Sequence, residues 1–541
     1  MKSIIKIMAL VLSVFALSSG TPPEALAADI VFSHPTGRRI LSESPDFPSQ
    51  RFSDPWNMDS PLDLSHGQYM SQLKNIRWKG GRFTATTTGG DPAVNPLFPG
   101  YLGNLPNGRD GLVNKIQASK YNRFSIRMYS SRRTSAQLFW FYNQTWNDFG
   151  VVTFVVERGW GTYIVNPRSS GAWRGKPLGL RLDPTSRKGV KFSIDWIRLY
   201  QQKKTRVKVA WRDSSPGQTI NLYVDNDKNP NNGNLGLAKT TTSRSSSLVR
   251  WDPSPWPRGI YYFYIKKSGQ AAVYSKRVKI NQVPLTKIID PDEGGGQDYA
   301  QTFNGKRWNM SGPQDIEQVR DIRNISFSNG IMSGISVNGD GFFHLPVTTP
   351  IDTNRYHRLT FRFRYDGAFD YGLGTMSRFI WSPDHNDLSK YQTIKDIVVY
   401  PGWTTYVIDL KKAALSAGTI GWNGQMTDFR FDPLEVPQPR RFFLDYIRLA
   451  ADDQADRFFI IKWRDAKKKR RPTLVSIYFD NNRSGFNGIR IVGNRKQRSG
   501  VNRYTWNTSR VPAGSYWIYT VAKDGVSTTR QYSKGPLVIT H

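Results

Sequence analysis

The chain is 541 residues long, has no cysteine and carries a formal net charge of +34 at pH 7. The lack of cysteine excludes disulfides and thiolate metal sites, so the folded parts must be large enough to be stabilised by apolar cores. The charge favours a polyanionic partner: acidic polysaccharide, lipopolysaccharide, extracellular nucleic acid or an anionic cell surface. A surface that is basic only for solubility is the alternative, although a smaller charge would serve that purpose.

The first 27 residues have the pattern of a secretory signal peptide. Lys2 and Lys6 precede an apolar run over residues 7–17, and a small-x-small cleavage site follows at Ala25–Ala27. The apolar run is shorter than the ~20 residues of a membrane-spanning helix. We therefore expect cleavage after Ala27 and a secreted, soluble chain without a transmembrane segment. Its expected place is extracellular or at the cell surface, with the periplasm as the alternative.

The rest of the sequence contains an internal repeat. An R-x-D-P turn and a following strand of the form D-[W/Y]-I-R-L occur over residues 181–199 and again over 430–449. Matching motifs flank both copies in the same order, with spacings that drift as loop insertions would make them drift. The sequence therefore predicts two copies of a longer A module and a shorter B module. The predicted boundaries are 1–27 for the signal peptide, 28–200 for A1, 201–285 for B1, 286–450 for A2 and 451–541 for B2.

Apolar and polar residues alternate along most segments of both modules, which is typical of half-buried β-strands. The expected strands of the first copy cover 123–129, 137–143, 151–157 and 191–200 in A1, and 206–211, 219–225, 247–252 and 259–267 in B1. Helix is expected only in two short stretches, 316–322 and 410–417. The predicted fold class is all-β: a tandem A-B-A-B array of jelly-roll sandwiches (A) and immunoglobulin- or fibronectin-like sandwiches (B).

The D-[W/Y]-I-R-L strand has apolar residues on both faces, so we expect it to be buried between layers. Asp195 within this strand then needs a partner, because an unpaired buried carboxylate is costly. The arginines of the R-x-D-P turns, Arg181 and Arg430, are the expected partners.

The end of each A module, "GLRLDP" followed by "FSIDWIRLY" in the first copy, resembles the galactose-binding-like jelly rolls, similar to carbohydrate-binding modules, of bacterial secreted proteins. This resemblance implies sugar binding on a sheet face or in the loops at one end, often on aromatic platforms, and often a structural calcium. The B modules resemble bacterial fibronectin type III-like repeats through segments such as "LYVDNDKNPNNGNLGLA". That resemblance implies spacer and adhesive modules. Neither resemblance implies catalysis.

Aromatic residues are the candidate glycan contacts, because sugar rings stack their C–H faces on Trp and Tyr. The alternative for each of them is a place in a hydrophobic core, which we favour for the repeated Trp56, Trp211, Trp308 and Trp463. The predicted glycan-binding residues are Trp140, Tyr142, Trp146, Trp160, Trp173, Trp381, Trp403 and Trp422.

A basic run in the second B module is the candidate polyanion site. The run has no counterpart in the first B module, so the fold does not require it. With nearby basic residues it is predicted to bind phosphates, sulfates or uronates through charge-assisted hydrogen bonds. A solvated loop is the alternative. The predicted residues are Lys467, Lys468, Lys469, Arg470, Arg471, Arg495, Lys496 and Arg498.

Loops rich in Asp and Asn in both B modules offer the hard oxygen ligands that calcium prefers. The candidate ligands are Asp225, Asp227 and Asp480. Asx turns form such loops without metal and are the alternative. We expect no other cofactor.

The sequence has no clear catalytic constellation, because its six histidines lack metal-site spacing and no phosphate loop or nucleophile elbow occurs. Carboxylates recur at Asp183/Asp432 and Asp195/Asp445, as a glycan hydrolase or lyase would need, but each lies in a motif expected to be buried. The sequence therefore predicts a non-catalytic protein that binds carbohydrate or another polyanion at the cell surface or in an extracellular matrix. The alternatives are a self-associating subunit of a fibre, sheath or surface layer, and a glycan-active enzyme.

Overall fold

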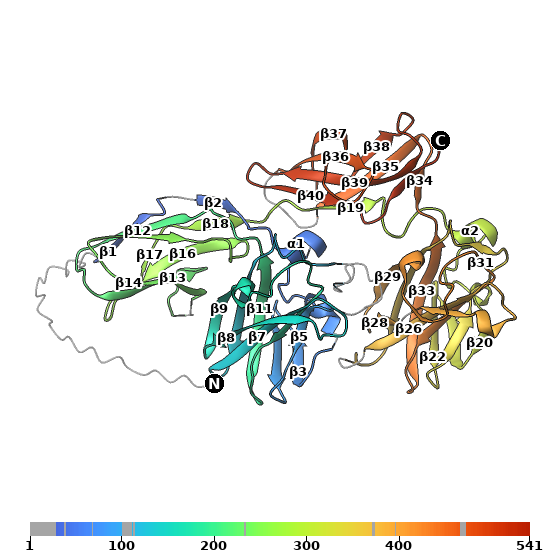
Figure 1. The fold of residues 1–541 in the computed structure, drawn as a ribbon, viewed down its shortest axis with the longest axis horizontal. Helices are drawn as coiled ribbons and strands as arrows, with labels where there is room; N and C mark the ends of the chain where they lie inside the picture. The colour runs from blue at the N-terminus through green and yellow to red at the C-terminus, as the bar shows by residue number, and fades with distance from the viewer. Residues whose placement is uncertain are drawn as a thin grey trace, which may run out of the picture.

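The computed structural model describes residues 29–36, 39–52, 54–67, 69–99, 111, 114–231, 234–370, 374–394, 396–465 and 472–541. It confirms the predicted fold class, because its regular structure is almost entirely β-strand, arranged as tandem β-sandwiches (Figure 1). The predicted signal peptide and the basic run from Lys467 to Arg471 lie outside the described residues. Within them, no helix is long and apolar enough to cross a membrane.

The A1 module is a sandwich of two antiparallel sheets with one hydrophobic cluster between them. The first sheet has the strand order β3 (Leu73–Trp78), β4 (Phe83–Thr87), β11 (Lys191–Tyr200), β6 (Arg123–Ser130), β9 (Gly159–Val165). The second has the order β5 (Val94–Leu97), β10 (Gly179–Asp183), β7 (Thr134–Phe141), β8 (Phe149–Val156). The R-x-D-P motif lies at β10 and the repeated strand motif is β11, so the two motifs belong to opposite sheets.

The A2 module repeats the first sheet strand for strand and enlarges the second. Its five-stranded sheet has the order β21 (Ile322–Ser328), β22 (Ile331–Ser336), β33 (Arg440–Ala450), β25 (Arg358–Tyr365), β29 (Thr404–Asp409). The other sheet has the order β20 (Glu317–Arg320), β23 (Gly341–His344), β32 (Asp428–Leu434), β26 (Thr375–Ser382), β27 (Gln392–Ile394), β30 (Leu415–Ala417), with β28 (Ile397–Val399) also beside β26. A separate pair joins β24 (Ile351–Asp352) to β31 (Gln425–Met426).

The B modules are smaller sandwiches that also match each other. The three-stranded sheets are β1 (Ile30–His34), β12 (Val207–Asp213), β15 (Ser246–Trp251) in B1 and β19 (Thr286–Asp290), β35 (Phe458–Asp465), β38 (Val501–Asn507) in B2. The larger B1 sheet is β14 (Gly236–Thr242), β13 (Thr219–Asp225), β16 (Gly259–Ile265), β18 (Val278–Asn281), β2 (Arg39–Ser42), with β17 (Val273–Tyr274) beside β16. The larger B2 sheet is β37 (Ile489–Lys496), β36 (Leu474–Asp480), β39 (Gly514–Lys523), β41 (Leu537–Ile539), β34 (Asp453–Ala455), with β40 (Thr528–Tyr532) beside β39.

Each A module is inserted into a B module rather than placed before it. Strands β1 and β2 precede A1 in the chain, yet β1 pairs with β12 and β2 pairs with β18, both in B1. Likewise β19 precedes A2 and pairs with β35 in B2. The starting points predicted from sequence, 28 and 286, assigned these strands to the A modules. Alternation reveals a strand but not its partner, and Ile30 and Ile288 are in fact buried in the B cores.

The arginine of the repeated strand motif donates hydrogen bonds to the segment that leads from the B module into the A module. Each segment that joins the two modules is called a crossing below. Arg198 donates to Glu43 Oε1 at 2.9 Å and to the Ser44 carbonyl at 2.9 Å. Arg448, in the same place in A2, donates to the carbonyls of Gly294 at 2.9 Å and Gly295 at 3.1 Å. In both copies the incoming crossing is therefore held against the middle strand of the five-stranded sheet, β11 in A1 and β33 in A2.

The R-x-D-P arginine has its partner within its own turn, so the predicted pairing with Asp195 is wrong. Arg181 Nε and Nη2 contact the two carboxylate oxygens of Asp183 at 2.6 and 2.9 Å. Arg430 holds Asp432 in the same bidentate way, at 2.7 Å for both bonds. Asp195 pairs instead with Arg127 at 3.3 Å. The prediction failed because β10 and β11 lie in opposite sheets, whereas β6, which carries Arg127, is paired directly with β11.

Neither stretch predicted to be helical is an α-helix. Residues 316–322 contain β20 and the start of β21, and 410–417 contain a 3-10 turn followed by β30. The α-helices among the described residues are α1 (Phe47–Phe52) and α2 (Tyr299–Phe303), each just after the chain enters an A module. Short 3-10 turns cover Pro61–Gly67, Pro167–Ser170, Pro313–Asp315, Leu388–Lys390 and Leu410–Lys412.

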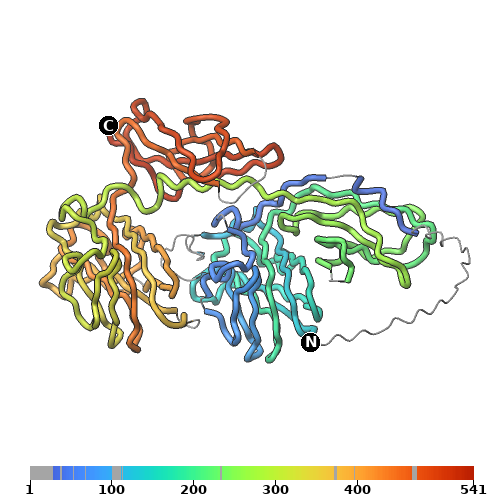
Figure 2. The backbone as a smooth tube through the Cα atoms, turned by 180° about the vertical axis from the view of Figure 1, so that it is seen from behind, coloured from blue at the N-terminus to red at the C-terminus, as the bar shows by residue number. Residues whose placement is uncertain are grey.

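The two A modules lie beside each other (Figure 2), and side chains of one contact the other. Phe98 of A1 is buried in the hydrophobic cluster of A2, and the His66 ring stacks on Tyr400 with 4.2 Å between ring centroids. The B modules therefore do not separate the A modules as spacers in a linear array would.

Because A2 is inserted into B2, we predict that Ile288, which precedes A2 in the chain, stabilises B2, most of which follows A2. Replacing Ile288, which is 3% exposed in the B2 cluster, with alanine should destabilise B2 by about 2–5 kcal/mol. Amide hydrogen exchange in β35 and β38 of the full chain would report the loss. Ile289→Ala is the matched control, because Ile289 is only half-buried and should cost less. Unchanged protection of β35 in the Ile288 variant would contradict the insertion.

Candidate functional site

Four of the eight predicted glycan-binding aromatics are core residues, so these predictions are wrong. Trp140 and Trp381 are fully buried, and Trp173 and Trp422 are 6% exposed. The rings pack in edge-to-face pairs, Trp140 on Trp173 and Trp381 on Trp422, with centroids 5.2 Å apart in both copies. Each indole N–H donates to a backbone carbonyl. Trp140 and Trp381 lie on strands β7 and β26 with their rings in the core. The surroundings of Trp173 and Trp422 misled the prediction, because these loops fold back to close one end of the sandwich.

Tyr142 and Trp146 are half-buried and already engaged. The Tyr142 hydroxyl donates to the Ala172 carbonyl at 2.5 Å and accepts from the Arg174 backbone N–H at 3.0 Å. Trp146 packs on Phe141 and Phe98, with centroids 4.7 and 5.7 Å away, at the contact with A2. Neither ring therefore offers an open platform for a sugar.

Trp160 and Trp403 do lie on an accessible surface, at matching places in the two copies. Both lie at the start of an edge strand, on the outer face of the five-stranded sheet, the face turned away from the sandwich core. Trp160 is 37% exposed, and the guanidinium carbon of Arg127 lies 5.3 Å from its ring centroid. Arg362 lies 4.5 Å from the Trp403 centroid in the same way. This outer face thus combines aromatic rings with cations.

In the first copy, B1 covers part of the outer face. Ser125 Oγ donates to the Pro255 carbonyl at 2.7 Å. Thr162 Oγ1 and Arg127 both donate to the Leu235 carbonyl, at 2.5 and 3.0 Å. The polar groups of this part of the face are therefore satisfied by the neighbouring sandwich.

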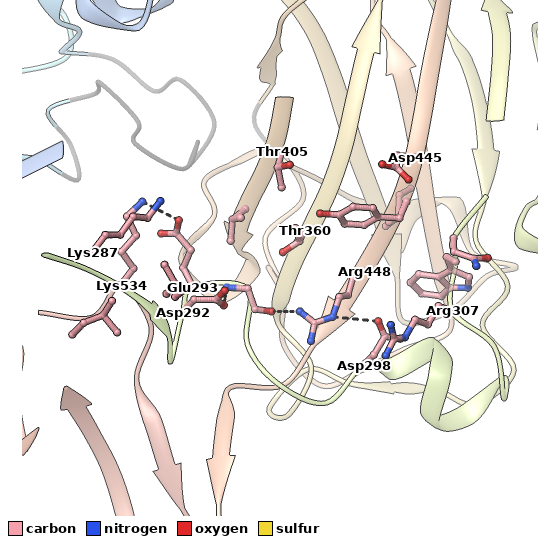
Figure 3. Close-up of a pocket in the computed structure, with 18 of the residues that line it drawn as sticks. Lys287, Asp292, Glu293, Asp298, Arg307, Thr360, Thr405, Asp445, Arg448 and Lys534 are labelled. Atoms are coloured by element: carbon pink, nitrogen blue, oxygen red, sulfur yellow. Dashed lines mark hydrogen bonds and ion pairs between the residues drawn. The ribbon is translucent and has the colours of Figure 1, made fainter. Parts of the chain in front are cut away.

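In the second copy, the matching groups line an open cavity of about 650 Å³ (Figure 3). Ser125 pairs with Arg198 across the sheet, and Thr360 pairs with Arg448 in the same register, so Thr360 takes the place of Ser125. Thr405 likewise takes the place of Thr162. The sheet face that B1 closes in A1 is thus open in A2, with strand β19 and the crossing after it forming the opposite wall (Figure 3).

The A2 wall of the cavity carries groups suited to hydroxyl-rich ligands. Thr360 Oγ1 is buried and has no hydrogen-bond partner within the described part of the chain. Because buried polar groups are normally paired, this hydroxyl marks a place where the wall lacks a hydrogen-bond partner. Thr405, Asp445 and Tyr446 line the same wall and add a second hydroxyl, a carboxylate and a phenol ring.

The opposite wall carries charges of both signs. It carries Lys287, Arg464 and Lys534 beside the acids Asp292 and Glu293, and Lys534 contacts Glu293 at 3.1 Å. On the A2 wall, Arg448 is engaged by the crossing carbonyls and by Asp298 at 3.4 Å. Arg464 also lines the cavity and is exposed, and within the described residues it has no acidic partner in an ion pair. An anionic group entering the cavity therefore meets a guanidinium that is not already neutralised.

Two neighbouring aspartates where the chain returns from A2 to B2 have opposite pKa shifts. Burial, reinforced by the nearby Asp292 and Asp290 carboxylates, raises the pKa of Asp453 to about 7. Its side chain accepts the Asp292 backbone N–H at 3.0 Å, which ties the two crossings together beside the cavity. Burial also acts on Asp452, but His357 and Arg358 outweigh it and lower the pKa of that carboxyl.

The described basic candidates of B2 lie at one end of its larger sheet. Arg495 and Lys496 are exposed on the edge strand β37, and Lys496 pairs with Leu474 at the start of β36. Arg498 is exposed just beyond that strand. These three cations therefore lie at the end of the sheet where β36 begins.

The calcium candidates are occupied by hydrogen-bond donors. Asp225 accepts from the Tyr274 hydroxyl at 3.0 Å and from the Asn226 backbone N–H at 2.8 Å. Asp480 accepts from the Tyr532 hydroxyl at 2.7 Å. Asp227 caps a turn by accepting the backbone N–H of Asn229 at 2.8 Å. These hydrogen bonds are those of Asx turns, and calcium, which needs six to eight oxygen ligands, stays a prediction for these loops.

Sequence reasoning missed the cavity itself. Its residues come from two modules, Thr360 and Arg448 from A2 and Arg464 from B2. The cavity exists only because A2 is inserted into B2. The repeat held one usable signal: polar residues occupy most outward positions of β6 and β9 in A1 and of β25 and β29 in A2, where a fully buried face would have been apolar.

Comparisons with known proteins assign no family. No protein family and no curated protein matches the sequence. A solved carbohydrate-binding module of family 29 is 13% identical over 31% of this chain and 89% of its own, with a TM-score of 0.20. A mutant family 29 module complexed with cellulohexaose is 12% identical over 32% and 94%, also at 0.20. An agarase is 12% identical over 27% and 26%, at 0.22. Similarities this low carry no functional assignment.

The opposite pKa shifts of Asp453 and Asp452 predict opposite effects of removing each charge. The folded state binds the Asp453 proton more tightly than the unfolded chain does. The protonated carboxyl therefore contributes to the stability of the fold below about pH 4, and this contribution is lost as the pH rises to about 7. Asp453→Asn should therefore stabilise the chain at pH 8. Asp452→Asn should destabilise it there, because the contribution of a carboxyl with a lowered pKa is present above its unfolded value. Thermal unfolding at pH 8 and pH 4 measures both, and equal signs at pH 8 would refute the assignment.

Proposed function

We propose that this protein is a secreted, non-catalytic binding protein for acidic polysaccharide, and that the cavity between A2 and B2 is its principal glycan site. The observation that carries the proposal is the buried, unpartnered Thr360 hydroxyl on a sheet face whose counterpart in the first copy is closed. A binding function explains why the face stays open in one copy while the fold is kept in both.

The cavity chemistry supports an acidic sugar as the ligand. Hydroxyl and carboxylate groups on the A2 wall suit sugar hydroxyls, and Tyr446 supplies an aromatic surface. Arg464 suits a uronate carboxylate, because a guanidinium donates charge-assisted bonds in a planar fork. A volume of about 650 Å³ lies within the usual range of small-ligand sites.

A second, less specific contact with the polymer fits the exposed cations of B2. Arg495, Lys496 and Arg498 are solvent-facing, and the overall charge of +34 attracts any polyanion. In this proposal the cavity gives selectivity for a sugar unit, and the basic end of B2 adds salt-sensitive attraction to the rest of the chain. The predicted signal peptide supports an extracellular or cell-surface location.

The recurring carboxylates support a non-catalytic role. Asp183 and Asp432 are each held by an arginine two residues earlier, and Asp195 and Asp445 pair with Arg127 and Arg362. Each of these acids thus has a structural partner in both copies. Release of reducing ends from an acidic polysaccharide by the purified chain would instead support an enzyme, and ordered polymers in micrographs would support a structural subunit.

The chain offers a matched pair of arginines for testing the site. Arg464 lines the cavity, and Arg212 is the exposed residue at the same place in B1. Arg464→Gln should weaken binding of a defined oligogalacturonate by about 10–100-fold, as expected for the loss of a hydrogen bond to a charged group. Arg212→Gln removes the same charge and should change binding little. Isothermal titration calorimetry on the full chain measures both.

Three outcomes would contradict the proposal. The wild-type chain would fail to bind any uronate oligomer, the two arginine variants would weaken binding equally, or a neutral cello-oligosaccharide of the same length would bind as tightly as the oligogalacturonate. The second outcome would indicate attraction by net charge alone.

A further inference from the structure

Two histidines and an aspartate converge at one end of the larger sheet of A2. His344 ends β23, Asp428 begins β32, and His385 lies in the loop after β26. Strand β32 pairs with both neighbours, so that Asp428 lies opposite Ser382 and the His344 backbone pairs with Arg430. The register of three adjacent strands therefore places the three side chains together, although they are up to 84 residues apart in the chain.

The ligand atoms of this cluster lie close enough together to hold one metal ion. His344 Nδ1 lies 2.5 Å from Asp428 Oδ1, and His385 Nδ1 lies 3.4 Å from the same oxygen. One ligand atom from each of the three residues lies within 4.8 Å of the others. Tetrahedral zinc with bonds of about 2.0–2.1 Å sets its ligand atoms roughly 3.3 Å apart. The His385–Asp428 distance already fits, and the His344–Asp428 distance has to lengthen by several tenths of an ångström as the metal replaces the shared proton.

A neighbouring amide orients the exposed ligand. The side-chain amide nitrogen of Gln318 lies 3.1 Å from Nε2 of His385, and a 180° flip of the amide exchanges this nitrogen for the oxygen. With its oxygen turned to that nitrogen, the amide accepts the Nε2–H and leaves Nδ1 unprotonated toward Asp428. Metal-bound histidines characteristically have such an outer partner for their second nitrogen.

The cluster is not required by the fold. Asp428 corresponds to Gly179 in A1, at the first residue of the matching strand, and A1 forms the same sandwich without a carboxylate there. His344 and Asp428 are 8% and 4% exposed at their side chains, whereas His385 is 39% exposed. Two ligands are therefore fixed by packing, and the third faces solvent.

We propose that His344, His385 and Asp428 form a zinc site with three protein ligands and an open fourth position. Two imidazoles and one carboxylate suit zinc, whereas calcium and magnesium prefer all-oxygen sites. The exposed side of His385 lets the ion enter from solvent, where water completes the coordination. This site lies on the sheet opposite the cavity face and is independent of the proposed glycan site.

Zinc binding to the full chain tests the proposal. After treatment with a chelator, the wild-type chain should bind one Zn²⁺ in equilibrium dialysis at neutral pH. Co²⁺ in place of zinc should give the visible absorption of a four-coordinate ion. His385→Ala should abolish the specific site, and His34→Ala, which removes a half-buried histidine of strand β1 in B1, should leave the stoichiometry at one.

A second variant keeps the test decisive if His385→Ala disturbs folding. Gln318→Ala removes only the outer partner of an exposed ligand and should weaken zinc affinity about 10–100-fold. Its far-ultraviolet circular dichroism should match the wild type. The proposal is overturned if the wild-type chain binds no stoichiometric zinc, or if binding is the same in the His385, Gln318 and His34 variants.

Discussion

The antiparallel pairing of β19 with β35 determines where everything else in the second copy lies. β19 belongs to B2, but the chain leaves it to build the whole of A2 and returns only at β34. Arg448 fastens the outgoing crossing to the A2 sheet, and Asp453 joins the returning chain to Asp292. The cavity is the space that this geometry leaves beside the sheet, with Lys287 and Arg464 supplied by the two paired strands.

The two copies share their strand order but differ in how the edge of the B sandwich is completed. The strand that pairs in parallel with the last B strand is β2, before A1, in the first copy, but β34, after A2, in the second. A1 is thus inserted after the second strand of B1, whereas A2 is inserted after the first strand of B2. B1 contacts the outer face of A1 through Leu235 and Pro255, whereas the same region of A2 lines a cavity. A small change in connectivity separates a closed interface from an open site.

The repeat, the β class and the buried Trp56, Trp211, Trp308 and Trp463 could be predicted from sequence, because alternation and self-similarity are local or nearly local signals. The partners of individual charges could not. Arg181 was expected to pair with Asp195, but the two residues lie in opposite sheets, and the Arg181 guanidinium binds Asp183 instead. Trp173 and Trp422 looked like loop residues, and only the closure of the sandwich end shows that they are covered. The cavity and the histidine cluster depend on strand register between distant segments, which composition and spacing do not encode.

Insertion also changes what a break in the backbone does to the molecule. Each A sandwich is connected to its B sandwich by two covalent crossings, one entering and one leaving. A protease that cuts either crossing in the second copy leaves A2 tied to B2 through the other, and β19 stays paired in its sheet. Such a nicked chain remains one particle until it is denatured, whereas domains strung end to end would part at the first cut.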